Sequence, residues 1–197
     1  MMVHPSFPAK TVPDFITHAK VNPGKLNYGS AGSGSVSHVV TELLKMTTRI
    51  NLVHVSYRGG DVQAITDLLG GHLQVYIGTL PASVEYVRAG NLRGLAVTSA
   101  TRSHALPEIP TMGEFLPGFE ASILWTGLHA PRNTPAEIVE KLNREINAGV
   151  ADPELKARLA ELGATPLRGS PADYAKLVVD ETEKWGKVVK LSGARPD

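Results

Sequence analysis

The residues whose types and spacing are best suited to binding or chemistry lie in one short stretch between an apolar segment and an amphipathic helix. The stretch consists of Ser30, Ala31, Gly32, Ser33, Gly34 and Ser35. Backbone N–H groups at a helix start have no partners inside the helix, and the helix dipole favours an anion there. Glycine lets the backbone approach a ligand closely, and serine caps the helix or donates its hydroxyl. The stretch therefore predicts an oxyanion site for a carboxylate or a phosphate. A serine-capped turn that binds no ligand remains the alternative.

The stretch does not match the standard templates for nucleotide binding or nucleophilic catalysis. A P-loop needs lysine after its second glycine, but Ser35 follows Gly34. The dinucleotide fingerprint needs glycine where Ser37 stands, and the nucleophile elbow needs glycine where Ala31 stands. These mismatches disfavour phosphate-chain binding and α/β-hydrolase chemistry.

Three side chains outside the stretch are further candidates for the same site. His38 follows in the first turn of the helix, where it either contacts a ligand or is solvated. Arg58 either makes a bidentate contact to a carboxylate or is an exposed turn residue. Tyr57 is expected to pack, with its hydroxyl reaching the crevice. His54 lies in the middle of a predicted strand and is expected to be a satisfied core residue.

The sequence predicts no catalytic pair, cofactor or metal site. The 7 histidines do not have the spacing of metal ligands, and the absence of cysteine excludes disulfides, thiolate metal sites and cysteine nucleophiles. A general base needs a positioned partner, and His38 is the one candidate beside the serines. A binding module therefore fits better than an enzyme. Two alternatives stay open: a small hydrolase or transferase that uses Ser33 or Ser35 with His38, and a non-binding interaction domain.

The composition sets broad limits on the function. With 197 residues, 42% hydrophobic and 20% charged, the chain is long enough for one ordinary globular domain or two small ones. A net charge of +1 without a run of Lys or Arg gives no basis for nucleic-acid binding. No apolar window is long enough to span a bilayer. The residues from Met1 to Pro5 have neither the basic nor the apolar region of a secretory signal, so none is expected.

The elements that position the candidate residues alternate between strands and helices. Beyond the helix that follows Ser35, strands are predicted at residues 52–57, 73–77 and 92–98. Helices are predicted between them, which indicates βαβ units in a mainly parallel sheet. The helix after Ser35 is expected to bury its valines and leucines and to turn His38 and Glu42 away.

Loops at the carboxyl ends of parallel strands are the usual ligand sites in such sheets. Three loops have this position, at residues 30–35, 58–61 and 78–80. They converge on one crevice if the order of strands allows it. The rest of the chain is predicted to be helical scaffold, with helices capped at Thr134, Asp152 and Ser170. Thr134 and Glu137 match a capping box.

In the order of its motifs the chain resembles the periplasmic solute receptors of tripartite tricarboxylate transporters, also called the Bug family. Each motif alone is weak, but their order and spacing over nearly the whole chain are specific. The motifs are Asn22–Tyr28, Gly29–His38, His54–Gly60, Asp67–Gly71, Leu95–Ser99, Ile109–Thr111, Pro117–Phe119, Leu162–Ala164 and Glu183–Trp185.

The resemblance implies an α/β, periplasmic-binding-protein-like fold of type II, a Venus flytrap that holds a small carboxylated solute between two domains. It assigns one full α/β ligand-binding domain to residues 23–122 and an N-terminal helix and link to residues 1–22. Residues 123–197 are then the crossover strand and the C-terminal helices of an incomplete second domain.

The resemblance also implies which residues bind the ligand. In the family, the serine and glycine loop grips a carboxylate with backbone N–H groups and hydroxyls, often through ordered water, and a second turn borders the cleft. The residues of this chain in these roles are Ser30, Ala31, Gly32, Ser33, Gly34, Ser35, His38, Tyr57, Arg58, Gly59 and Gly60. The implied protein is a periplasmic, non-catalytic receptor that delivers a small carboxylate to the membrane components of a transporter.

The chain departs from the family pattern in three ways. Ser56 stands where proline is usual, and Gly78 stands where an acidic residue is common, which weighs against recognition of a ligand amino group. We also expect the signal peptide and the first segment, with its opposing carboxylate loop, to be missing. Helices meant to cover the missing sheet would expose apolar stripes, which predicts a homo-oligomer, a swapped arrangement or a companion segment.

Overall fold

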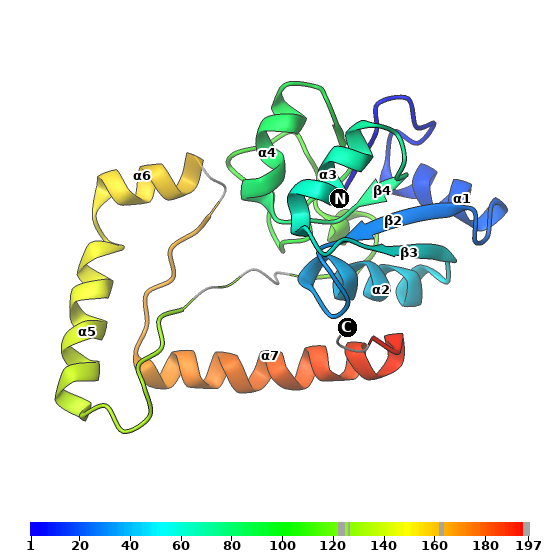
Figure 1. Cartoon of the computed structure of the whole chain (residues 1–197). Helices are drawn as coiled ribbons and strands as arrows, with labels where there is room; N and C mark the ends of the chain where they lie inside the picture. The colour runs from blue at the N-terminus through cyan, green and yellow to red at the C-terminus, as the bar shows by residue number, and fades with distance from the viewer. Residues whose placement is uncertain (122–124, 126, 162–163, 195–197) are drawn as a thin grey trace.

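The computed structural model describes residues 1–121, 125, 127–161 and 164–194, and its main body is a sheet with helices on both faces (Figure 1). The strands are β1 (Met2–Val3), β2 (Leu26–Ser30), β3 (Leu52–Ser56), β4 (Val75–Tyr76) and β5 (Arg93–Gly94). The helices are α1 (Val12–Val21), α2 (Val36–Thr48), α3 (Gly60–Leu69), α4 (Leu80–Arg88), the 3₁₀ helix η1 (Met112–Glu114), α5 (Ala136–Gly149), α6 (Pro153–Glu161) and α7 (Pro171–Ser192).

The sheet order is β3-β2-β4-β1-β5, with β2 parallel to both of its neighbours. Ser30 is in register with Ser56 of β3, and Gly29 is in register with Tyr76 of β4. The carboxyl ends of these three strands therefore meet at one edge of the sheet. This order confirms the expectation that the loops after them converge.

The sheet also differs from the sequence prediction. β1 was not predicted, and it is antiparallel to both β4 and β5. β4 and β5 are shorter than the apolar runs at 73–77 and 92–98. Leu95 N–H still donates to the Met1 carbonyl at 2.9 Å, and Val97 then pairs with the segment around Thr111: Val97 N–H donates to the Pro110 carbonyl at 2.8 Å.

Each face of the sheet has its own apolar core. The core under α1 and α2 includes Val12, Phe15, Tyr28, Val40, Leu44, Leu52 and Val75. The core under α3 and α4 includes Tyr57, Ala64, Ile65, Leu68, Leu73, Tyr76 and Leu92. Helix α1 and strand β1 belong to these cores, so residues 1–22 pack as part of the α/β body. The domain boundaries themselves remain a prediction.

Helix α2 is covered on two sides, which corrects the prediction that its polar residues face away. His38, Thr41 and Glu42 are buried, at 6%, 0% and 8% exposure. His38 and Glu42 face the sheet, where His38 stacks on His54 and Glu42 accepts from the Tyr28 hydroxyl. Helix α7 packs along another side of α2 (Figure 1). No buried side-chain nitrogen or oxygen lacks a partner among the described residues: Thr41 donates to the Ser37 carbonyl, and Glu42 accepts from the Tyr28 hydroxyl.

Helices α5 and α6 extend away from the α/β body (Figure 1). The predicted capping box at Thr134 does not form, because the Thr134 hydroxyl donates to the Pro131 carbonyl at 2.8 Å and Pro135 occupies the cap. The box at Ser170, which opens α7, does form. The predicted crossover strand falls partly on residues 122–124 and 126, outside the described residues.

Helix α5 exposes an apolar stripe of Ile138, Leu142 and Ile146, at 44%, 48% and 37% exposure. Exposed stripes were expected for these helices, and the oligomer or companion segment that they predict stays a prediction. Within the described ranges, none of the helices combines the length and hydropathy that crossing a bilayer requires.

An ion pair fixes the segment that carries η1. Arg102 donates to the Glu114 carboxylate at 2.8 and 2.6 Å, and the Thr111 N–H donates a third bond at 2.9 Å. The hydrogen bond from Arg102, followed by that from Thr111, lowers the pKa of Glu114 to about 2. The Thr111 side chain accepts from the Glu114 N–H in return, which completes a capping box.

The Glu114→Gln variant is expected to lose stability at neutral pH but not at low pH. The folded-state pKa lies below the ordinary value of 4.5, so the carboxylate stabilises the fold above that pH. This contribution is lost as the pH falls from about 4.5 towards about 2. Urea midpoints of E114Q and wild type, measured between pH 7 and pH 3, should converge as the pH falls. Glu108→Gln, at an exposed carboxylate, is the control, and a gap for E114Q that does not change with pH would contradict the prediction.

Candidate functional site

The serine and glycine loop is anchored to the central strand at its first residue. Ser30 is fully buried, and its carbonyl accepts the Tyr57 N–H at 3.0 Å, which extends the β2–β3 ladder by one bond. The backbone then turns through Gly32 (φ +119°) and Gly34 (φ +77°), two conformations that side chains with a Cβ rarely adopt. The glycines therefore allow a tight passage from the buried strand to the start of α2.

The backbone N–H groups of the loop have acceptors within the chain. Ala31 N–H donates to the Ser37 hydroxyl at 2.9 Å, and Gly34 N–H donates to Nδ1 of His38 at 3.0 Å. Ser35 caps α2 by accepting the His38 N–H at 3.4 Å. The expectation of several unpaired N–H groups is thus wrong for these positions. Side chains from the first turn of α2 take the place that an anion would occupy.

A second network connects the loop to the neighbouring strand and helix. The hydroxyl of Tyr76, in β4, donates to the carboxylate of Asp61 at the start of α3. Burial raises the pKa of Tyr76, the bond to Asp61 raises it further, and a hydrogen bond from Ser37 opposes this rise. Ser37 also accepts from Ala31. Sequence reasoning missed Ser37, Asp61 and Tyr76, because their connection depends on the strand order.

Beneath the loop lies a stack of three rings. His38 and His54 are parallel within 9°, with 3.9 Å between ring centroids, and Tyr28 stacks on His54 at 4.9 Å. The Tyr28 hydroxyl donates to Glu42 at 2.6 Å, and Lys45 pairs with the same carboxylate at 2.6 Å. Burial, followed by the bond to Glu42, raises the pKa of Tyr28.

The two histidines therefore have clear structural roles. The solvated alternative for His38 is wrong, because its side chain is buried in the stack. The prediction that His54 is a satisfied core residue is confirmed in its contacts: Nε2 lies 2.6 Å from the Ser30 hydroxyl. The ligand-binding role of His38 stays a prediction.

The second candidate turn, after β3, borders the loop through the parallel β2–β3 pairing. Tyr57 packs as predicted, but its hydroxyl donates to Asp67 of α3 at 2.6 Å. Burial, followed by this bond, raises the pKa of Tyr57 to about 12. Arg58 and Gly59 are exposed, and Gly60 adopts φ +75° as α3 begins.

Gly78 accounts for one departure from the family pattern. A Cβ at this position would clash with the Tyr76 ring. The orientation of Tyr76 that reaches Asp61 therefore excludes any side chain at residue 78, an acidic one included. The absence of a carboxylate at residue 78 and the Tyr76–Asp61 hydrogen bond therefore both depend on the same position of the Tyr76 ring.

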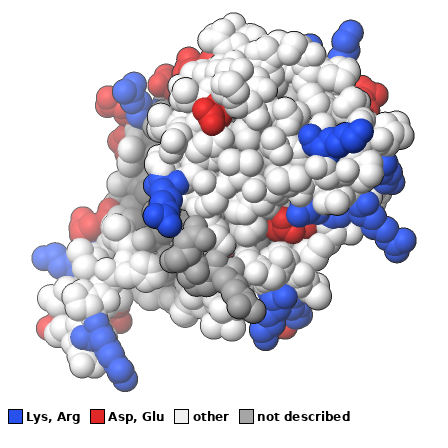
Figure 2. Space-filling view, turned by 45° about the vertical axis from the view of Figure 1, so that its right-hand side comes forward, with Lys and Arg blue, Asp and Glu red and all other residues white. Residues whose placement is uncertain are grey.

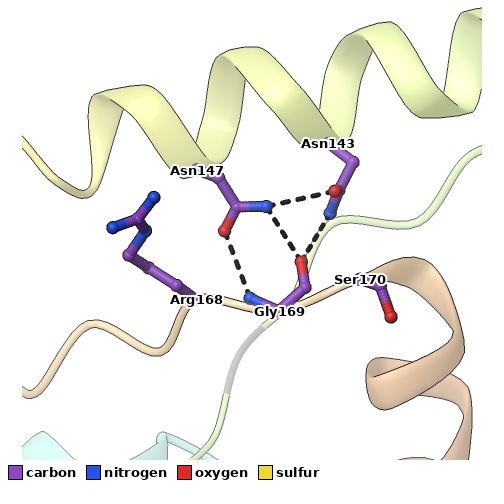
Figure 3. A pocket seen from close by; sticks show the side chains of 5 residues that line it. All are labelled: Asn143, Asn147, Arg168, Gly169 and Ser170. Atoms are coloured by element: carbon purple, nitrogen blue, oxygen red, sulfur yellow. Dashed lines mark hydrogen bonds between the residues drawn. The ribbon is translucent and has the colours of Figure 1, made fainter.

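Two surface hollows lie elsewhere. The larger, about 430 Å³, is lined by Asn143, Asn147, Arg168, Gly169 and Ser170 (Figure 3). There the two asparagine amides hold the Gly169 backbone, which fixes the start of α7 against α5. A hollow of about 270 Å³ lies between α2 and α7. Neither is lined by residues of the serine and glycine loop.

The described residues also limit the chemistry of the site. No group of three or more His, Cys, Asp or Glu that could hold a metal ion occurs among them. Basic and acidic side chains are interspersed on the face shown in Figure 2 rather than gathered in a patch of one sign. The sheet edge carries hydroxyls and the exposed guanidinium of Arg58, which are donors for an anion, and backbone N–H groups that would have to exchange an internal acceptor for one.

Comparisons with known proteins identify relatives over almost the whole chain. Residues 1–194 match the family model described as "Tripartite tricarboxylate transporter family receptor". Protein BugT of Bordetella pertussis is 34% identical over 99% of this chain and 60% of its own length. The structure described as Rhodopseudomonas palustris Rpa4515 with adipate is 38% identical, with a TM-score of 0.89 over 100% of this chain and 65% of that one. MatC from the same organism, with bound malate, is 30% identical, with a TM-score of 0.83 over 95% of this chain and 65% of its own.

These comparisons confirm the family resemblance and the periplasmic-binding-protein-like α/β fold. The family and the fold are those of solute-binding receptors rather than of enzymes. This chain spans about 60% of the length of BugT and 65% of the two solved chains, so the function of the whole receptor is treated below as a proposal.

The Gly34→Ala variant tests the backbone geometry of the loop. An added Cβ meets nothing within 4 Å, so the cost comes from the positive φ alone, about 1–2 kcal/mol of unfolding free energy. Gly186→Ala is the matched control, because its Cβ also meets open space but lies inside α7. It should stabilise the fold by about 1 kcal/mol. Urea unfolding measures both, and a G34A variant as stable as wild type would contradict the positive φ.

Proposed function

We propose that this chain, which belongs to the tripartite tricarboxylate transporter receptor family, binds a small dicarboxylate at the carboxyl edge of its sheet. The ligand is held by Ser30–Ser35 and by the turn of Tyr57, Arg58, Gly59 and Gly60. The receptor works in the periplasm without catalysis and delivers its ligand to the membrane components of the transporter.

The observation that carries this proposal is the parallel pairing of β2 with β3 and β4. This pairing brings the serine and glycine loop, the turn at Arg58 and the end of β4 to one edge. The start of α2 points its positive dipole end at the same place. Anion sites in α/β sheets have this arrangement.

Hydrogen bonds must provide most of the affinity. The dipole of α2 contributes about 0.3–2 kcal/mol to binding of an anion. A carboxylate gains more from charge-assisted bonds, which are worth about 1.5–3 kcal/mol each. Arg58, exposed beside the loop, is the cation that provides such a bond.

Two observations indicate the chemical class of the ligand: the ligands of neighbouring structures, and the absence of a carboxylate at residue 78. Adipate and malate, the ligands in the titles of two neighbouring structures, are dicarboxylates without an amino group. Gly78 leaves no carboxylate to pair with a ligand amino group, because the Tyr76 ring fills that space. Both observations favour a plain dicarboxylate over an amino acid.

Adipate and malate are therefore expected to raise the melting temperature. At 100 times the dissociation constant a ligand stabilises the fold by about 2.7 kcal/mol, which corresponds to about 5–10 °C for a chain of this size. Scanning calorimetry across a series of di- and tricarboxylates measures the shift, and the uncharged diamide of adipate is the control. If no carboxylate shifts the transition, the chain is not a working receptor, and the interaction-domain alternative gains support.

The Arg58→Ala variant is expected to weaken binding of the best carboxylate about tenfold, which corresponds to 1.4 kcal/mol. The loss reflects one charge-assisted hydrogen bond at an exposed position. Arg144→Ala removes another exposed guanidinium, on α5, and should bind as wild type does. Isothermal titration calorimetry measures both affinities. Equal affinities for R58A and wild type would remove Arg58 from the site.

A further inference from the structure

The contact between Gly34 and His38 joins the serine and glycine loop to an imidazole, the side-chain group whose ordinary pKa lies closest to neutral pH. The Gly34 N–H donates to Nδ1 of His38 at 3.0 Å, and Gly34 is exposed while His38 is buried. Nδ1 accepts this bond only when it carries no proton. The neutral form of His38 therefore ties down an amide of the loop, and the protonated form, with N–H at both ring nitrogens, does not.

The His38 ring is stacked with two other rings. His54 stacks on His38 at 3.9 Å, and Tyr28 stacks beneath at 4.9 Å from His54. Glu42 accepts from the Tyr28 hydroxyl of this stack and pairs with Lys45 at 2.6 Å. The charges of Glu42 and Lys45 are opposite and offset each other. Protonation of a histidine in the stack therefore adds a positive charge that this ion pair does not neutralise.

The close stacking disfavours a positive charge on both imidazoles at once. Two positive charges separated by 3.9 Å repel strongly in a partly buried site. Nε2 of His54 lies 2.6 Å from the Ser30 hydroxyl, which also donates to the Gly32 carbonyl at 3.0 Å and accepts the Gly32 N–H at 3.2 Å. The bond from Gly34 to His38 has a backbone N–H as its donor, which cannot act as an acceptor.

We propose that His38 is a positioning residue of the serine and glycine loop. Its neutral imidazole accepts the Gly34 N–H, and protonation of the ring releases that N–H to bind the ligand. This inference rests on the proposed carboxylate site. The released N–H becomes a donor for the carboxylate, and the imidazolium adds a positive charge under the loop. Both changes favour an anion, so proton and ligand binding assist each other.

The first experiment needs no ligand. In ¹⁵N-labelled protein, the amide resonance of Gly34 should shift between pH 8 and pH 6 with the same midpoint as the His38 ring. In the His38→Asn variant, an amide oxygen replaces Nδ1 as acceptor but does not titrate, so the Gly34 shift should disappear. His72→Asn, which removes an exposed histidine at the far end of α3, should leave it in place. A Gly34 resonance that does not titrate in the wild type overturns the proposal, even if H38N does not fold.

The second experiment measures adipate affinity at pH 8 and pH 6, where the ligand carboxylates stay mainly ionised. Wild type and H72N should bind about fivefold more tightly at pH 6, and H38N should lose this dependence. A pH dependence that survives in H38N but disappears in His54→Asn would assign the charge to His54 and overturn the proposal. If adipate binds at neither pH while Gly34 still titrates, the proposed function fails and the role of His38 stands. If adipate binds equally at both, the coupling fails and the site stands.

Discussion

The parallel pairing of β2 on both of its edges is the constraint on which the rest of the site depends. Because β3 and β4 run in the same direction as β2, three loops that are far apart in sequence emerge side by side. The Tyr57 N–H extends this ladder to Ser30, so the ladder ends where the serine and glycine loop begins. A change in strand order would leave each loop intact but separate them, and no shared anion site would exist.

Much of the fold was predictable from local patterns, because they depend on residues close in sequence. The alternation of strands and helices and the caps at Ser35 and Ser170 follow from such patterns. The unpredicted features depend on distant partners. Strand β1 has only two residues and forms because β4 and β5 lie on either side of it. The cap at Thr134 failed because its hydroxyl found the Pro131 carbonyl instead.

In the candidate site, too, local features were predictable from the sequence and contacts between distant residues were not. Its loops were identified from glycine, serine and arginine in the sequence, but its supporting network was not. Amphipathic periodicity assumes that polar residues face water, and in α2 this assumption fails. The buried Tyr28 hydroxyl needs an acceptor, and Glu42 on the polar side of α2 provides it. The buried polar side of the helix, with His38 on it, is the consequence.

The internal hydrogen bonds of the loop reduce the free energy that a carboxylate gains when it binds there. A loop with free N–H groups would gain the full energy of each bond to a carboxylate. Here a carboxylate has to replace Ser37 at Ala31 and His38 at Gly34, so each gain is a difference between two hydrogen bonds. Such an exchange favours the ligand because a carboxylate is a stronger acceptor than a hydroxyl or an imidazole. It also makes affinity depend on the side chains that are displaced, which form a second determinant of binding beneath the loop itself.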